Sequence, residues 1–240
     1  MSHILLCLHG WGGSKESFTE LRAALAGSDS TILTPDLPGF GTEPEPSSPF
    51  SVDDYADWAE HWLAKQLSIV NDPLSISLLG HSHGGRIAIK LAVRKKITID
   101  HLYLCAAAGI RHPSFKRSTG AFFAKIGKAI FALPLLKSLE PPARKILYKL
   151  LREHDYERAS PMMQRTHARV TSEDLTPLLP AITVPTDIFW GENDTMTPVA
   201  DGRTMHDLIK GSVLHTFPGV RHRVHRDRAA EISAIIRNHL

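Results

Sequence analysis

The sequence has no long hydrophobic run: none of its 240 residues lies in a stretch of 18 or more apolar positions. A membrane-spanning helix needs about 20 such residues, so we expect no transmembrane segment. The opening residues, MSHILLCLHG, also lack the basic stretch and the small-residue cleavage site of a secretory signal. We therefore interpret their apolar run as a buried strand.

Cysteine is scarce as well, since only Cys7 and Cys105 are present, each within an apolar stretch. Two buried thiols in a chain without an export signal predict a reducing compartment, and we expect a cytoplasmic protein. Internal repeats and low-complexity tracts are absent. So is any interleaving of basic and aromatic residues, which argues against a nucleic-acid partner.

The chain does have a regular alternation of short apolar runs and helical patterns, which is typical of a parallel sheet covered by helices. Most of the apolar runs are continuous rather than alternating, as expected for strands that are buried on both faces. The candidate strands are residues 3–9, 31–36, 74–80, 99–107, 185–191 and 211–219.

Helix starts can be recognised between these strands. Ser14 and Ser51 are suited to cap the two helices that follow them, and Pro198 is suited to the first turn of a third. The helix after Ser51 has one apolar stripe, which we expect to be buried. The stripe consists of Val52, Tyr55, Ala59, Trp62 and Leu63.

Residues 110–180 break the alternation, because they contain no good strand and read as short helices interrupted by prolines. We predict an α/β core of residues 1–109 and 181–240 that carries this segment as a helical cap. The net charge is only +3, yet residues 111–169 hold 13 Lys and Arg against 4 Asp and Glu.

The simplest interpretation of residues 121–139 is a lid helix with its apolar face on the core and Lys125, Lys128 and Lys137 in water. The alternative is that the basic cap recruits an anionic partner. That partner would be a carboxylate-bearing substrate, an acidic carrier protein or an anionic lipid surface.

Residues 80–85, GHSHGG, lie between a predicted strand and a predicted amphipathic helix, and they match the G-x-S-x-G pattern of a nucleophile elbow. Gly80 and Gly84 allow a sharp turn, because a Cβ at either position would crowd the neighbouring strand or helix. Ser82 then lies at the positive end of a helix, where an oxyanion is stabilised. The alternative is a tight turn with a capping serine.

A serine hydroxyl needs a base and an orienting acid to become a nucleophile. Asp194 follows the fifth predicted strand, and His222 follows the sixth. Because the carboxyl ends of parallel strands share one edge of a sheet, both can converge on Ser82. His225 is the rival base, and the rival acids are Glu192, Asp187 and Asp201.

Two backbone amides are needed for the oxyanion of the tetrahedral intermediate. We predict that they belong to His83, which follows the nucleophile, and to Trp11 in the glycine-rich loop HGWGG. The residues expected around the substrate are His9, Gly10, Phe40 and His81.

The 14 histidines raise the alternative of a metal site formed by His81, His83, His222 and His225. A structural zinc site usually has tighter ligand spacing and often cysteines, so we expect no metal and no other cofactor. His9 is expected to brace the oxyanion loop, and the remaining histidines are most simply solvated surface residues.

Taken together, five segments resemble the α/β-hydrolase superfamily, in particular its small cap-bearing serine hydrolases. The resemblance implies a mostly parallel sheet of about six strands that lacks the usual first two, with helices on both faces and an inserted helical cap. It also implies the triad order Ser82, Asp194, His222. The segments are HGWGG (9–13), PDLPGFG (35–41), GHSHGG (80–85), WGENDTMTP (190–198) and GVRHRVHRD (219–227).

The function implied is a serine hydrolase that cleaves a small carboxylic ester or thioester, anionic or carrier-linked, through an acyl-enzyme on Ser82. A serine at the elbow argues against dehalogenases and epoxide hydrolases of this fold, which use an aspartate there. The alternatives are a hydrolase of C–C bonds in ring-fission products, a lyase on the same scaffold, and a non-catalytic ligand-binding protein. Arg223 stands where C–C hydrolases commonly carry a tryptophan, and the sequence leaves the oligomeric state open.

Overall fold

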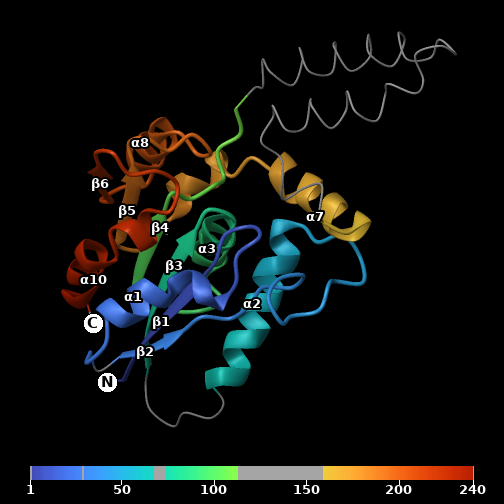
Figure 1. Cartoon of the computed structure of the whole chain (residues 1–240), viewed down its shortest axis with the longest axis horizontal. Coiled ribbons are helices and arrows are strands. Elements are labelled where there is room, and N and C mark those ends of the chain that lie inside the picture. Colours follow the sequence, from blue (N-terminus) through green and yellow to red (C-terminus); the bar gives the residue numbers. More distant parts are fainter. Residues whose placement is uncertain (1, 29, 68–73, 113–158, 240) are drawn as a thin grey trace, which may run out of the picture. The chain divides into compact units, whose positions relative to one another are not determined.

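The computed structural model describes residues 2–28, 30–67, 74–112 and 159–239. Within these residues, six strands form one sheet in the order β2-β1-β3-β4-β5-β6, and every neighbouring pair is parallel (Figure 1). The six predicted strands are confirmed. They are β1 (Ser2–Leu8), β2 (Ser30–Leu33), β3 (Leu74–His81), β4 (His101–Cys105), β5 (Thr186–Gly191) and β6 (Val213–Phe217).

The order of the strands reverses at β1, which lies between β2 and β3. After β1 the chain moves outward to β2 and then crosses back to β3. In open parallel sheets the carboxyl ends of the strands beside such a reversal form the ligand-binding crevice. The HGWGG loop after β1 and the Ser82 turn after β3 both lie at this point.

Helices cover both faces of the sheet, α1 and α10 on one face and α2, α3 and α8 on the other (Figure 1). The predicted α/β fold class is therefore confirmed. The α-helices in the described residues are α1 (Thr19–Ala24), α2 (Val52–Leu67), α3 (His83–Arg94), α7 (Pro161–Ser172), α8 (Val199–Leu208), α9 (Val224–Asp227) and α10 (Ala229–Arg237). Two 3-10 helices accompany them, η1 (Lys15–Phe18) and η3 (Thr176–Ala181).

The predicted helix caps are largely confirmed. The Ser14 side chain accepts a hydrogen bond from the Glu16 N–H at the start of η1. Ser51 and Asp54 cap α2 reciprocally: the Asp54 N–H donates to Ser51 Oγ, and the Ser51 N–H donates to Asp54 Oδ2. Pro198 lies one position earlier than predicted, because it immediately precedes α8 rather than occupying its first turn.

The chain divides into two compact units, residues 1–111 with 165–240, and residues 112–164. The first contains the sheet. Of the second, the structure describes only residues 112 and 159–164, so the predicted helix at 121–139 and its lysines lie outside the described residues. The cap over residues 110–180 thus stays a prediction, and η3 clusters with the sheet.

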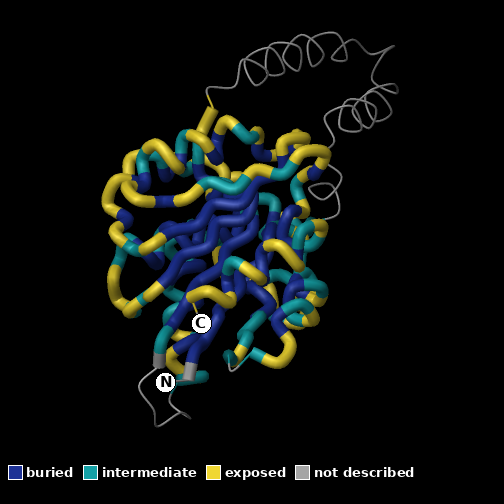
Figure 2. The backbone as a smooth tube through the Cα atoms, turned by 90° about the vertical axis from the view of Figure 1, so that its left-hand side faces the viewer, coloured by how far each residue is buried: buried dark blue, intermediate teal, exposed yellow. Residues whose placement is uncertain are grey.

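The strands in the middle of the sheet are almost completely buried, whereas the loops at both ends are exposed (Figure 2). Cys7 on β1 and Cys105 on β4 are unpaired and fully buried. Burial raises the pKa of both thiols, which therefore stay protonated and act as small apolar side chains. No helix among the described residues has the length and apolar character needed to cross a bilayer.

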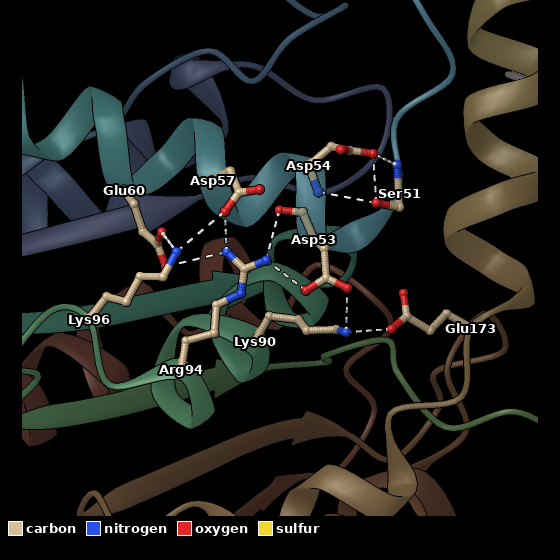
Figure 3. A network of polar contacts seen from close by, with 9 residues as sticks. All are labelled: Ser51, Asp53, Asp54, Asp57, Glu60, Lys90, Arg94, Lys96 and Glu173. Atoms are coloured by element: carbon tan, nitrogen blue, oxygen red, sulfur yellow. Dashed lines mark hydrogen bonds and ion pairs between the residues drawn. The ribbon is translucent and has the colours of Figure 1, made fainter.

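An ion-pair network fastens α2 to the C-terminal half of α3 (Figure 3). The guanidinium of Arg94 on α3 lies 2.7 Å from both Asp53 Oδ1 and Asp57 Oδ1 of α2, and 3.3 Å from Glu60 Oε1. Lys90, one turn earlier on α3, lies 2.8 Å from Asp53 Oδ2. Because Ser82 is continuous with α3, this network also holds the helix on which the candidate nucleophile depends.

Replacing Arg94 by Ala should lower the free energy of unfolding by about 1–2 kcal/mol, because a largely covered guanidinium loses several charged hydrogen bonds at once. Lys96→Ala is the matched control. Its ammonium also pairs with Glu60, but the side chain is 61% exposed, so little change is expected. Urea denaturation of both variants measures the difference, and equal losses would contradict a special role for Arg94.

Candidate active site

Ser82 occupies a strained turn between the end of β3 and the start of α3. Its backbone dihedrals are φ 51° and ψ −111°, a region that a residue with a Cβ rarely adopts. Two hydrogen bonds hold this conformation: the Ser82 N–H donates to Cys105 O at 3.2 Å, and the Ala108 N–H donates to Ser82 O at 2.9 Å. The turn thus has the form of a nucleophile elbow, supported by the last residue of β4 and by the chain that follows it.

Gly84 is required by the close approach of this turn to β1. A Cβ at this position would overlap the carbonyl group of Leu8, and nothing in a strand backbone can give way. A Cβ on Gly80 would likewise lie only 2.6 Å from the Gly84 carbonyl oxygen. The predicted reason for both glycines is therefore confirmed.

Asp194 lies in the loop after β5, where its carboxylate accepts hydrogen bonds on both oxygens. Oδ1 accepts from the N–H groups of Met196 (2.8 Å) and Thr197 (3.1 Å). Oδ2 accepts from Thr197 Oγ1 and from His222 Nδ1, each at 2.8 Å. Burial alone would raise the pKa of Asp194, but these hydrogen bonds and the electrostatic influence of His222 outweigh it and lower the pKa, so the carboxylate stays ionised.

His222 lies in the loop between β6 and α9, with Nδ1 directed at Asp194. Because the carboxylate accepts the proton of Nδ1, the neutral ring has its acceptor nitrogen at Nε2, as a general base requires. His81 connects this loop to the Ser82 turn, since its Nε2–H donates to the carbonyl oxygen of His222 at 3.0 Å. The residue next to Ser82 in the chain is thus bonded to the backbone of His222.

The rival base, His225, is buried in α9 rather than placed in the loop. Its ring packs 3.9 Å from that of His81 and 5.3 Å from that of Phe18, measured between centroids. Burial, assisted by the electrostatic influence of the neighbouring His222 and Arg226 side chains, lowers the pKa of His225 to about 3. The imidazole that Asp194 holds is therefore that of His222.

The rival acids have other surroundings. Glu192 accepts a hydrogen bond from the exposed Thr216 hydroxyl, and Asp201 lies in the first turn of α8. Asp187 is the second residue of β5, so it lies at the end of the strand away from Asp194, where His101 and His215 bond to it.

The HGWGG loop packs directly against Ser82. A Cβ added to Gly10 would lie 3.2 Å from the Cβ of Ser82 and 2.9 Å from Nδ1 of His81. The loop is a tight turn closed by the Gly13 N–H and the Gly10 carbonyl at 3.0 Å, with Gly12 at φ 71°. Trp11 precedes Gly12 in this turn.

His83, the other predicted amide donor, is the first residue of α3, so its N–H has no acceptor within the helix. Its side chain is buried between the rings of Trp11 and Tyr55, with centroids at 5.4 and 4.8 Å. Burial lowers the pKa of His83 well below its ordinary value, and neither ring nitrogen has a hydrogen-bond partner among the described residues. The His83 ring therefore stays neutral and packs as part of the aromatic cluster with Trp11 and Tyr55.

His9 and Phe40 support the loop from behind. The Leu37 N–H donates to His9 Nε2 at 2.9 Å, and His9 Nδ1 donates to the Gly10 carbonyl at 2.8 Å, so both nitrogens of this fully buried ring are used. Phe40 is half-buried and packs edge-on against Trp11 at 4.9 Å. The structure thus confirms that His9 braces this loop, because its ring joins the loops after β1 and β2, while its place beside the substrate stays a prediction.

Sequence reasoning missed Thr197, which contacts both members of the Asp194–His222 pair. Its hydroxyl lies 2.8 Å from Asp194 Oδ2, 3.2 Å from His222 Nδ1 and 3.2 Å from the Ala106 carbonyl. The available signal was local: an aspartate followed three residues later by a threonine favours a capped turn in which the carboxylate accepts backbone N–H groups.

The model of the family described as "Alpha/beta hydrolase family" matches residues 5–235. The chain belongs to this family. The hydrolase is 28% identical over 245 residues to a pimeloyl-[acyl-carrier protein] methyl ester esterase of Neisseria meningitidis, covering 96% of this chain and 91% of that protein.

Solved structures of low sequence identity share the fold of this hydrolase. An esterase from Exiguobacterium antarcticum superposes with a TM-score of 0.73 at 22% identity, covering 99% of this chain and 91% of that one. MenH from S. aureus superposes with a TM-score of 0.69 at 24% identity, covering 98% and 91%. The family resemblance expected from the five sequence segments is therefore confirmed.

The buried histidines near Ser82 should make the free energy of unfolding of the hydrolase fall as the pH is lowered. Folding lowers the pKa of His225 from 6.5 to about 3 and that of His81 well below 6.5, so the unfolded chain binds more protons in this range. Their contribution to stability is complete above about pH 6.5 and falls as the pH drops toward 3, by up to about 1.4 kcal/mol per pH unit for each histidine.

His225→Leu should therefore flatten the dependence of the urea midpoint on pH between 6.5 and 4, whatever its effect on stability at neutral pH. The exposed His61 on α2 provides the control, because His61→Leu should leave the slope unchanged. Equal slopes in the wild type and His225→Leu would contradict this assignment.

Proposed function

We propose that the hydrolase cleaves a small carboxylic ester or thioester through an acyl-enzyme formed on Ser82, with His222 as general base and Asp194 as its orienting acid. The observation that carries the proposal is the 2.8 Å hydrogen bond between His222 and Asp194, in a loop bonded through His81 to the strained Ser82 turn. The esterase among the similar proteins supports the same chemistry.

The acylation step follows from the tautomer of His222. Ser82 Oγ attacks the carbonyl carbon of the ester while its proton moves to Nε2 of His222. Asp194 remains ionised and stabilises the imidazolium, because its pKa is held low by its four hydrogen bonds. Collapse of the tetrahedral intermediate breaks the bond to the leaving oxygen or sulfur, which takes the proton from Nε2.

The oxyanion of the intermediate would be bound by the amides of His83 and Trp11. The first lies at the positive end of α3, and the second lies in a loop that packs directly on Ser82. In deacylation, water gives a proton to His222 Nε2 and attacks the acyl carbon, and the same amides hold the second oxyanion. The carboxylic acid then leaves and Ser82 Oγ regains its proton.

The rings of Trp11, Phe40, Tyr55, His83 and His167 contact one another edge-on around the amide donors. Such an aromatic cluster suits an acyl chain with apolar carbons.

We further infer that the substrate is anionic or carrier-linked, because the similar Neisseria protein is named for an acyl-carrier-protein ester and residues 111–169 are rich in Lys and Arg. We also propose that residues 110–180 form a helical cap over the core and that the protein is cytoplasmic.

Ser82→Ala should abolish labelling by a fluorophosphonate and lower kcat for short acyl esters at least about a thousandfold. His222→Ala should match it, whereas His225→Leu should lose far less activity, since its ring does not hold Asp194. A panel of esters of increasing chain length, assayed beside a ring-fission dienone, measures these effects. Labelling that survives in Ser82→Ala, or preferential turnover of the dienone, would overturn the proposal.

Thr197→Val should lower kcat about 10- to 100-fold with little change in KM, because Asp194 loses a hydrogen bond that orients it toward His222. Thr197→Ser keeps the hydroxyl and should restore most of the rate. Steady-state kinetics on a short ester separate kcat from KM. An effect confined to KM, or failure of the serine variant to restore the rate, would show that Thr197 only fills space.

A further inference from the structure

Three histidines surround one buried carboxylate at the amino end of β5, away from Ser82. Asp187, only 5% exposed, lies 2.7 Å from His101 Nε2 through Oδ2 and 2.6 Å from His215 Nε2 through Oδ1. His239 Nε2 lies 3.8 Å from the same Oδ2. The two carboxylate oxygens thus have different surroundings: two imidazoles lie near Oδ2 and one near Oδ1.

The strand register brings these side chains together. Tyr103 on β4 is the partner of Asp187 on β5, and His101 lies two residues before Tyr103, so all three point to one face of the sheet. His215 is the partner of Phe189, two residues after Asp187, and points to that face as well. The chain after α10 adds His239, whose ring stacks on His101 at 4.1 Å between centroids.

No step of the proposed reaction uses this cluster, because the reacting groups lie at the carboxyl ends of the strands. The sequence predicts solvated surface positions for both His3 and His101, and this prediction is wrong: each residue is only 6% exposed. Burying an aspartate and a histidine side by side is costly unless the charge is paired or coordinates a metal ion.

We propose that His101, Asp187 and His239 bind a divalent transition-metal ion, for which Zn²⁺ is the best match. Their ligand atoms all lie within 4.8 Å of one another. Ligand atoms around a tetrahedral zinc are about 3.3 Å apart, as follows from metal–ligand distances of about 2.0–2.1 Å. The 2.7 Å contact of His101 with Oδ2 and the 3.8 Å contact of His239 lie on either side of this value.

The chemistry of the donors also matches zinc. Two imidazoles and one carboxylate form a common three-ligand set, which leaves the fourth position for water. His215 would donate to Oδ1 and so orient the carboxylate without binding the ion, the usual role of a hydrogen bond behind a metal ligand. On binding, the proton on His101 Nε2 shifts to Nδ1, and the ion replaces the hydrogen bond to Asp187.

His239 provides the access and the adjustment that binding requires. Its side chain is 41% exposed, whereas those of His101 and Asp187 are 8% and 7% exposed. The His239 ring can therefore rotate off the face of His101 and direct Nε2 at the ion, while the two buried ligands stay in place. The alternative is a hydrogen-bonded cluster that stabilises the fold without any ion.

The test is a calorimetric titration of the full chain with ZnCl₂ after metal has been stripped with EDTA. The wild type should bind one ion at this cluster and gain thermal stability from it. His239→Ala, which removes the most exposed ligand, should weaken binding at least about tenfold, and His215→Gln should weaken it by about the same factor. His61→Ala removes an exposed histidine of α2 and should bind as the wild type does.

Asp187→Asn should also abolish binding. Because this substitution removes a buried carboxylate and can destabilise the fold, its result counts only for a folded variant. Zinc at the imidazoles around Ser82 is distinguished by His222→Ala, which should retain the binding that His239→Ala loses. Cobalt(II) substitution gives an independent readout, because tetrahedral cobalt has an intense visible spectrum that His239→Ala should lack. Absence of binding, equal affinity in His239→Ala, or loss of binding in His222→Ala would overturn the proposal.

Discussion

The site of this hydrolase depends on one steric constraint, the contact between the Ser82 turn and the end of β1. Gly84 allows the first turn of α3 to lie against the Leu8 carbonyl, and Ser82 is left in a backbone conformation that its own Cβ disfavours. The strain is compensated by hydrogen bonds to the chain after β4 and by the packing of α3, which ion pairs fasten to α2. The HGWGG loop, which continues from β1, is consequently held beside the serine.

Burial assigns different roles to chemically identical imidazoles. His81 and His225 are enclosed without a carboxylate partner, and burial lowers their pKa, so they stay neutral beside the Asp194–His222 pair. His222 has the only imidazole that bonds to Asp194 in the described residues. The His222 ring therefore has a carboxylate beside it that would stabilise an added proton, whereas the rings of His81 and His225 only pack around it. His81 also positions the loop of His222 through its hydrogen bond to the His222 carbonyl oxygen.

The same sheet carries polar groups at both ends, and they differ in what surrounds them. At the carboxyl end, backbone N–H groups and a threonine hydroxyl hold Asp194 and direct it at one histidine. At the amino end, the Asp187 carboxylate lies close to the imidazoles of His101, His215 and His239. The first arrangement favours proton transfer at a fixed ring, and the second has the donor atoms of a metal site.

The sequence by itself determined the order and type of the strands, the caps at Ser14 and Ser51, and the positions of Ser82, Asp194 and His222, because each depends on residues close in the chain. Local patterns predict the turn at Ser82 and place Asp194 and His222 just after strands. Only the tertiary structure showed that Asp194 bonds to His222 rather than to His225, that His9 is fully buried, and that His101 bonds to Asp187. Those outcomes depend on the register of the strands and on which side chains are buried. The spacing of residues close in the chain specifies neither the register nor the burial.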